Sequence, residues 1–316
     1  MIRGRRYRVI EQLSLSNRGR WKVWEPDPKP QGTYRTIVEL PEDSASVQFK
    51  NALSRMLENR AGFPKLIAWD RADGRLRLVL PWCTGIDLKS YLDRARASKA
   101  QRPSLWESVR RIRSLAHALS TLHRHCQVVH GDIKPANLVL PSDPGTISMI
   151  DFGNCWPIER TFYRVEGDGL DQFYSAPELL SNASIVSPRA DQFSAAIVLY
   201  EMLTLQRPYA GLGGKAGLAQ YRNEAERSYR KPSQLLQDKD RIPRLILDEL
   251  DLLLGRALLL EPESRFGNCQ QFAEALDVLW LRLQATRVSH ELTGKTTIGR
   301  LTRMLDWLKR YFEQAA

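Results

Sequence analysis

Three polar residues with the chemistry of phosphate and metal binding lie close together near the middle of the chain. Asp132 is followed two residues later by Lys134 and five residues later by Asn137, and Asp151 opens an Asp-Phe-Gly triplet after an intervening apolar run. A carboxylate can orient a hydroxyl group or accept its proton, and carboxylate and amide oxygens suit the hard cation Mg²⁺. The joint spacing therefore favours phosphate chemistry over a structural role as loop caps.

The segment His-Gly-Asp-Ile-Lys-Pro-Ala-Asn at 130–137, followed by the Asp-Phe-Gly triplet, resembles the catalytic and metal-binding loops of the serine/threonine protein-kinase family. The resemblance implies transfer of the γ-phosphate of ATP to a protein hydroxyl, with Mg²⁺ as the metal. It implies that Asp132 positions the acceptor hydroxyl and that Lys134 contacts the γ-phosphate. Asn137 and Asp151 would bind Mg²⁺ and so help to hold the nucleotide.

Three further matches to this family lie in the C-terminal half. Glu178 ends an Ala-Pro-Glu triplet that resembles the end of an activation segment, and Asp191 begins a run that resembles the central buried helix. Arg265 resembles the arginine that pairs with the glutamate of that triplet. The resemblance implies that Asp191 accepts hydrogen bonds from catalytic-loop amides and that Glu178 pairs with Arg265. Small-molecule phosphotransferases generally lack these elements, so a protein substrate is favoured.

The order of apolar segments predicts the fold. Short apolar segments between turn residues indicate antiparallel strands at 6–10, 21–24, 33–38, 66–69 and 76–80, and helical periodicity covers 44–59 and 106–125. The resemblance implies a further, buried helix at 191–204. With the resemblance, which extends from about residue 6 to 283, this order predicts a bilobal α+β kinase-like fold. Its expected parts are an antiparallel-sheet N-lobe at 1–81, a hinge and helical C-lobe at 82–286, and a helical C-terminal extension at 287–316.

The segment from Leu78 to Leu88 resembles the hinge between the two lobes of a kinase. The resemblance implies that the Pro81 carbonyl and the Cys83 amide bind adenine and that Asp87 meets the ribose hydroxyls. A proline is acceptable at position 81, because only its carbonyl group would be used.

The expected phosphate-covering loop departs from the family pattern. If Val23 is the valine that follows the glycine-rich loop and borders the nucleotide, the three glycine positions hold Ser16, Arg18 and Trp21, and Gly19 is the only glycine nearby. Glycines let backbone amides approach phosphates closely. Their absence predicts a looser or differently shaped cover.

The ion pair that usually orients the nucleotide phosphates is also missing. The third strand has Val38 or Glu39 in place of the family's lysine, and Ala52 stands where the pairing glutamate is expected. Joint loss is physically consistent, because a lone buried charge would be uncompensated.

Two hypotheses follow from the missing lysine. In the first, Lys22 beside Val23 contacts the nucleotide, as a lysine from that neighbourhood does in the with-no-lysine kinases; Lys29 and Arg35 are further candidates. Because side chains alternate along a strand, this needs a one-residue adjustment, and an outward surface lysine is the alternative. In the second, the protein is a pseudokinase, a scaffold or regulatory binding module that holds Mg-ATP without turnover. Retention of all four polar residues of the two loops favours an active enzyme.

Regulation by activation-loop phosphorylation is not expected. Gly131 stands where many kinases have the arginine that binds a phosphorylated residue, although Thr161 and Tyr163 offer hydroxyls. Asp171 lies where a threonine often precedes the Ala-Pro-Glu triplet. The choice between serine, threonine and other hydroxyl acceptors is therefore not set by this motif.

The composition is that of an ordinary soluble globular protein, with 43% hydrophobic and 26% charged residues among 316. No apolar run approaches the ~20 residues of a membrane span, and no signal-peptide core follows the basic N-terminus, so we expect a cytoplasmic protein. The four scattered cysteines predict reduced thiols rather than a disulfide framework or zinc site.

The net charge of +11 is compatible with acidic partners, but no aromatic-basic motif for nucleic-acid binding accompanies it, so a solvated basic surface is favoured. Residues 295–316 form a predicted basic amphipathic helix. Such a helix can bind an anionic membrane or a groove of a partner protein, or it can pack on its own domain.

Overall fold

The structure is a computed structural model of the chain. It describes residues 1–14, 19–26, 32–42, 47, 50–51, 65–141, 146–158, 161–163, 170–180 and 183–292. Several sequence predictions fall outside these residues: most of the helix at 44–59 with Ala52, the glycine-loop positions Ser16 and Arg18, Lys29, and the helix at 295–316.

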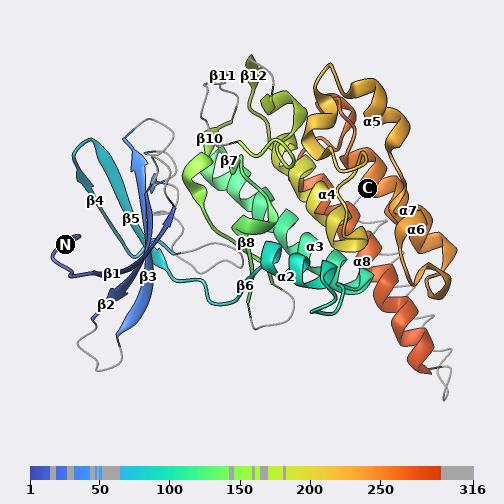
Figure 1. Ribbon diagram of the computed structural model, residues 1–316, viewed down its shortest axis with the longest axis horizontal. Helices are drawn as coiled ribbons and strands as arrows, with labels where there is room; N and C mark the ends of the chain where they lie inside the picture. The colour runs from blue at the N-terminus through green and yellow to red at the C-terminus, as the bar shows by residue number, and fades with distance from the viewer. Residues whose placement is uncertain are drawn as a thin grey trace.

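One antiparallel sheet forms the N-terminal lobe (Figure 1). Its strand order is β1-β2-β3-β5-β4, and neighbouring strands are antiparallel throughout. The tight β4–β5 turn uses Asp73 and Gly74, both with positive φ (53° and 68°), as a two-residue hairpin of the primed type requires. The strands are β1 Arg8–Ser14, β2 Arg20–Glu25, β3 Thr33–Pro41, β4 Ala68–Ala72 and β5 Arg75–Pro81.

The two faces of this sheet bury different sets of apolar residues, because side chains alternate along a strand. Val38 and Leu78 join the main core that continues into the second lobe. Ala68 and Val79 instead pack with Ile2 in a small cluster on the other face. The face that carries Val38 is therefore the one that looks toward the second lobe.

The second lobe is helical and lies on the opposite side of the linking segment in Figure 1. Its central helix is α4, in which every residue from Ala190 to Thr204 is buried, as expected for a helix that is apolar on all sides. Helices α3 and α8 pack against each other beside it. The helices are α2 Leu88–Arg96, α3 Leu105–Thr121, α4 Pro188–Thr204, α5 Arg222–Ser228, α6 Pro232–Leu235, α7 Arg244–Ala257 and α8 Cys269–Leu292.

Short strands join the helices of the second lobe, and β8 and β9 flank the polar loops. The short strands form three small sheets, β6-β8-β9, β7-β10 and β11-β12. Their bounds are β6 Ile86–Asp87, β7 Val128–Val129, β8 Leu138–Leu140, β9 Ser148–Met149, β10 Trp156–Pro157, β11 Thr161–Tyr163 and β12 Ala183–Ile185.

The predicted bilobal α+β architecture is confirmed: an antiparallel-sheet lobe is joined by one segment to a helical lobe. Among the residues that the structure describes, no helix has both the length and the apolar character needed to cross a bilayer.

Candidate active site

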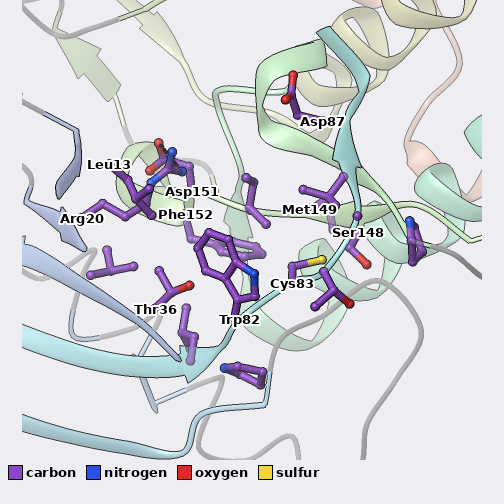
Figure 2. A pocket seen from close by; sticks show the side chains of 18 of the residues that line it. Leu13, Arg20, Thr36, Trp82, Cys83, Asp87, Ser148, Met149, Asp151 and Phe152 are labelled. Carbon is purple, nitrogen blue, oxygen red and sulfur yellow. Dashed lines mark ion pairs between the residues drawn. The ribbon is translucent and has the colours of Figure 1, made fainter. Parts of the chain in front are cut away.

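A cavity of about 550 Å³ lies between the two lobes (Figure 2). Both lobes contribute to its wall: Thr36 and Val38 from β3, the segment that follows β5, and Asp151 and Phe152 from the loop after β9. This volume is in the range of small-molecule sites, which usually occupy such clefts between structural units.

The predicted hinge residues line this cavity. Pro81, Cys83 and Asp87 all lie in its wall. Burial raises the pKa of the Cys83 thiol, so that side chain is neutral at physiological pH. The Asp87 carboxylate caps α2: it accepts hydrogen bonds from the Ser90 amide at 2.8 Å and the Ser90 hydroxyl at 2.7 Å.

The predicted catalytic residues are held together below the cavity. Lys134 Nζ lies 2.9 Å from Asp132 Oδ1, and the Asn137 amide donates to the backbone carbonyl and to Oδ2 of Asp132 at 3.0 and 2.8 Å. The Asp132 side chain is only 6% exposed. Its orientation is thus fixed by two neighbours that come from the same loop.

Burial raises the pKa of Asp132 from its ordinary value of 3.8 to about 6, although the charge and hydrogen bond of Lys134 oppose this shift. The nearby Asp151 carboxylate adds to the increase. A buried carboxylate with a raised pKa is more basic than a surface aspartate, which suits a group that accepts a hydroxyl proton.

The antiparallel pairing of β8 with β9 explains how the loops of Asn137 and Asp151 meet although the two residues are 14 positions apart in the sequence. The antiparallel pairing of Leu138 with Met149 places the start of one strand beside the end of the next. The Ile150 amide donates to the Asn137 carbonyl at 2.9 Å, which continues this pairing by one step. Asp151 follows with φ of +64°, a conformation that costs a non-glycine residue roughly 1–3 kcal/mol and is typical of functional sites.

The donor set in this cleft fits Mg²⁺ bound together with a phosphate-containing ligand. The Asn137 amide nitrogen is used by Asp132, which leaves its side-chain oxygen for a cation, and the Asp151 carboxylate is partly exposed to the cavity. Within the described ranges, no group of three or more histidine, cysteine, aspartate or glutamate side chains forms a complete metal cage. Mg²⁺ commonly takes only one or two protein carboxylates and completes its shell with phosphate and water oxygens.

The catalytic loop is anchored from the central helix. Asp191 on α4 accepts hydrogen bonds from the backbone amides of His130 at 2.7 Å and Gly131 at 2.9 Å, and from His123 Nε2 at 2.8 Å. Burial alone would raise the pKa of Asp191, but the His123 hydrogen bond and charge hold it below its usual value. The prediction that Asp191 binds catalytic-loop amides is confirmed.

Gly131 has a structural reason to replace the arginine found in many kinases. Its φ is +74°, and a Cβ atom there would lie 2.6 Å from the Asn154 carbonyl oxygen. The loop after Asp151 thus passes too close to accept a side chain at this position.

Glu178 and Arg265 form the predicted ion pair. Arg265 Nη1 and Nη2 lie 2.8 and 2.9 Å from the two carboxylate oxygens of Glu178. The Arg265 side chain is fully buried and also donates to the backbone carbonyls of Leu259 and Leu260. This pair joins the end of the activation segment to the base of the helical lobe.

The structure corrects the sequence assignment of Val23 as a nucleotide-contacting residue. Val23 pairs with Arg35 on β3 and is absent from the cavity wall, whereas the cavity residues Thr36 and Val38 lie opposite Lys22 and Arg20. Directly opposite residues of antiparallel strands point to the same face of a sheet. The pocket side of β2 therefore carries Arg20 and Lys22, one residue out of phase with the expected alignment.

Lys22 lies on the pocket-facing side of β2, as the hypothesis of a relocated lysine requires, but its side chain does not reach the loop that holds Asp151. Its Nζ atom lies over the rings of Tyr34 and Trp82, 4.7 and 4.5 Å from their centroids. Arg20, which the sequence interpretation missed, does reach that loop: its Nη1 atom lies 3.1 Å from Asp151 Oδ2 (Figure 2). The alternation of side chains along β2 places Val23 away from the cavity and Arg20 toward it. Arg20 could therefore have been predicted as a cavity residue if the register of β2 had been known.

Comparison with known proteins agrees with this geometry. Residues 60–281 match the family described as protein kinase domain. The serine/threonine-protein kinase PknJ of Mycobacterium tuberculosis is 28% identical over 280 residues, which cover 85% of this chain and 44% of PknJ. The Arabidopsis thaliana serine/threonine-protein kinase AtPK1/AtPK6 is 28% identical over 196 residues, or 58% of this chain and 38% of that protein.

Solved structures give the same fold. The crystal structure of the Mycobacterium tuberculosis PknI kinase domain aligns with a TM-score of 0.58 and 23% identity, covering 88% of this chain and 97% of that domain. The curated relatives above are more than twice as long as the segment of them that this chain matches. The fold is thus that of a kinase domain, and the chain belongs to the protein kinase family.

Proposed function

We propose that this domain is an active protein kinase that transfers the γ-phosphate of Mg-ATP to a serine or threonine hydroxyl of a protein. The observation that carries the proposal is the buried group of Asp132, Lys134 and Asn137 beside Asp151. A scaffold has no evident need for a buried carboxylate whose burial raises its pKa to about 6.

A second cavity supports a macromolecular acceptor. It has a volume of about 560 Å³ and is lined by Lys134, Asp171, Phe173 and Arg207, among others. Ala136 lines both this cavity and the one between the lobes, so the catalytic loop separates a nucleotide site from an acceptor site. A polypeptide bound in the second cavity would lie beside Lys134, whose Nζ atom is 2.9 Å from Asp132 Oδ1.

The proposed chemistry uses each residue of the loop once. Asp132 accepts the proton of the acceptor hydroxyl while the hydroxyl oxygen forms a bond to the γ-phosphorus of ATP. The bond between the γ-phosphorus and the β,γ-bridging oxygen breaks, and ADP leaves with that oxygen. Lys134 donates to the transferring phosphoryl group and keeps Asp132 ionised near neutral pH. Asn137 and Asp151 would hold Mg²⁺, which would stabilise phosphate charge when bound.

The alternative is a pseudokinase that binds nucleotide without turnover. Two observations favour it. Arg20 forms an ion pair with Asp151, the carboxylate that an active kinase needs for its metal. The described part of β3 also offers Thr36 and Val38, rather than a lysine, to the cavity.

A phosphate-transfer assay distinguishes an active kinase from a pseudokinase. It measures incorporation of labelled γ-phosphate from Mg-ATP into a generic basic protein and into the domain itself. The control variant is Asp132→Asn, which keeps the shape of the side chain. We expect incorporation by the wild type and a loss of about 10²- to 10⁴-fold in the variant, the usual contribution of a general base. Equal incorporation by both proteins, or none by the wild type, would move the assignment to a pseudokinase. Mass spectrometry of the acceptor identifies the modified hydroxyl.

A further inference from the structure

The phosphate end of the cleft needs a cation that β3 does not supply. The pocket-facing residues of β3 are Thr36 and Val38, and their partners on β2 are Lys22 and Arg20. The strand next to β3 thus carries two cations on the pocket-facing side. Arg20 lies directly opposite Val38, so its side chain starts one strand away from the position where a β3 lysine would start.

Arg20 extends toward the loops that hold Asp151. The Arg20 Nη1 atom lies 3.1 Å from Asp151 Oδ2, and the side chain is 17% exposed. Its Nε and Nη1 atoms are both buried; Nη1 faces the Asp151 carboxylate, whereas Nε makes no hydrogen bond in the described part of the protein. A buried donor without an acceptor is costly, and an anionic ligand in the cavity would satisfy it.

The other cations near the cavity are placed differently. Lys22 lies on the aromatic rings of Tyr34 and Trp82, at the hinge side of the cavity. Lys65 lines the cavity but is exposed to solvent. Neither forms an ion pair with Asp151.

We propose that Arg20 is the phosphate-binding cation of this kinase domain and replaces the missing β3 lysine. This inference rests on the proposed function, because it assigns Arg20 to the phosphates of the same nucleotide. A guanidinium group is always charged and presents several donors in a plane, so it can bind phosphate oxygens while it remains near Asp151. Arg20 is a positioning residue for phosphoryl transfer as well as a ligand-binding one.

The inference is tested by comparing the affinities for ADP and for adenosine, which differ only in the diphosphate. Isothermal titration is performed on the wild type and on Arg20→Met, Arg20→Lys, Lys22→Met and Lys65→Met, with and without Mg²⁺. We expect Arg20→Met to weaken ADP binding by about 10- to 100-fold, the usual effect of losing a charge-assisted hydrogen bond, and adenosine binding by less than twofold. Arg20→Lys keeps the charge, so its affinity for ADP should lie between those of the wild type and of Arg20→Met.

The two lysine variants serve as matched controls. Lys22→Met should change both affinities by the same factor, because Lys22 stacks on the hinge residue Trp82. Lys65→Met removes an exposed lysine of the cavity wall, so any loss that it causes should be the same for ADP and for adenosine. Equal losses for ADP and adenosine in Arg20→Met, or a loss confined to ADP in a lysine variant, would overturn the assignment. If Arg20→Met does not fold, as judged by circular dichroism, Arg20→Lys decides alone: an unchanged ratio of ADP to adenosine affinity contradicts the inference.

Failure of this inference is distinguishable from failure of the proposed function. A wild type that binds ADP through Arg20 but transfers no phosphate would remain a nucleotide-binding pseudokinase with the assigned cation. A wild type that transfers phosphate while Arg20→Met binds ADP normally would remain a kinase with another phosphate ligand. A wild type that binds neither ADP nor adenosine contradicts both.

Discussion

At the scale of single residues, the site combines a buried base with the groups that hold it in place. Asp132 is oriented by Lys134 and Asn137, and its carboxylate is nearly removed from solvent. The same burial that makes Asp132 more basic also makes it costly to ionise in the folded protein. The burial that favours function at Asp132 therefore lowers the stability of the folded protein. A neutral replacement of Asp132 should raise the free energy of unfolding at pH values where the carboxylate is ionised.

We predict that Asp132→Asn stabilises the folded protein at alkaline pH. The folded-state pKa of about 6 lies above the ordinary value of 3.8, so the cost of ionising Asp132 is absent below about pH 4 and complete above about pH 6. Two pKa units correspond to about 3 kcal/mol, and this expected gain already includes the opposing effect of Lys134 on the pKa. Urea unfolding of the wild type and of Asp132→Asn measures this gain in the free energy of unfolding. We expect the gain to be about 1 kcal/mol smaller at pH 5 than at pH 8.

Asp93 provides a control with the opposite sign. The hydrogen bond from Lys89 lowers the pKa of Asp93, so its ionised form stabilises the fold above the unfolded pKa and that contribution is lost as the pH falls through the folded pKa. Asp93→Asn should therefore not stabilise the protein at pH 8. A stability gain for Asp132→Asn that is independent of pH would contradict the assignment of a raised pKa to Asp132.

The residue scale also shows what the sequence could and could not predict. Asp132, Lys134 and Asn137 lie within one loop, so their proximity follows from spacing alone. Arg20 and Lys22 depend on the register of β2, and the β1–β2 pairing contains two register shifts, between Val9 and Glu11 and between Gln12 and Ser14. A one-residue shift moves every side chain of a strand to the other face. Both extra residues, Ile10 and Leu13, lie in β1, and β2 pairs regularly with β3. The expected alignment on Val23 was wrong by one residue because the sequence before β2 has no glycine pattern from which to align the strand.

At the scale of secondary structure elements, two polar contacts between distant segments position the site. Asp191 fixes the catalytic loop to α4, and the Glu178–Arg265 pair fixes the activation segment to the segment before α8. Both were predictable because each residue lies in a motif with a distinct sequence pattern. The phosphate cover was less predictable, because no such pattern is present between β1 and β2.

We predict that Glu178→Ala destabilises the protein by about 3–5 kcal/mol, because it leaves the buried Arg265 guanidinium without its counter-charge. Urea unfolding measures the change. The matched control is Asp248→Ala, which removes the exposed ion pair at 2.9 Å with Arg244 on α7 and should cost less than about 1 kcal/mol. Similar costs for the two variants would show that the Glu178–Arg265 pair is not the anchor that its burial indicates.

At the scale of the whole molecule, the nucleotide cleft couples the two lobes. The sheet lobe contributes β2 and β3, the helical lobe contributes the Asp151 loop, and the segment after β5 joins them. A ligand in this cleft contacts surfaces of both lobes, so it should stabilise the domain as a whole rather than one lobe. The size of that effect follows from mass action.

We predict that ADP at 100 times its dissociation constant stabilises the domain by about 2.7 kcal/mol, with a further increment from Mg²⁺ at the same ADP concentration. The increment depends on Asp151, because the described residues of the cleft offer no complete metal cage without phosphate oxygens. Asp151→Asn should abolish the Mg²⁺ increment in a thermal-shift titration and retain the adenosine response, because adenosine carries no phosphate. The variant also removes the partner of Arg20, so its ADP response without Mg²⁺ should equal or exceed that of the wild type. A Mg²⁺ increment that persists in Asp151→Asn would place the metal elsewhere in the cleft.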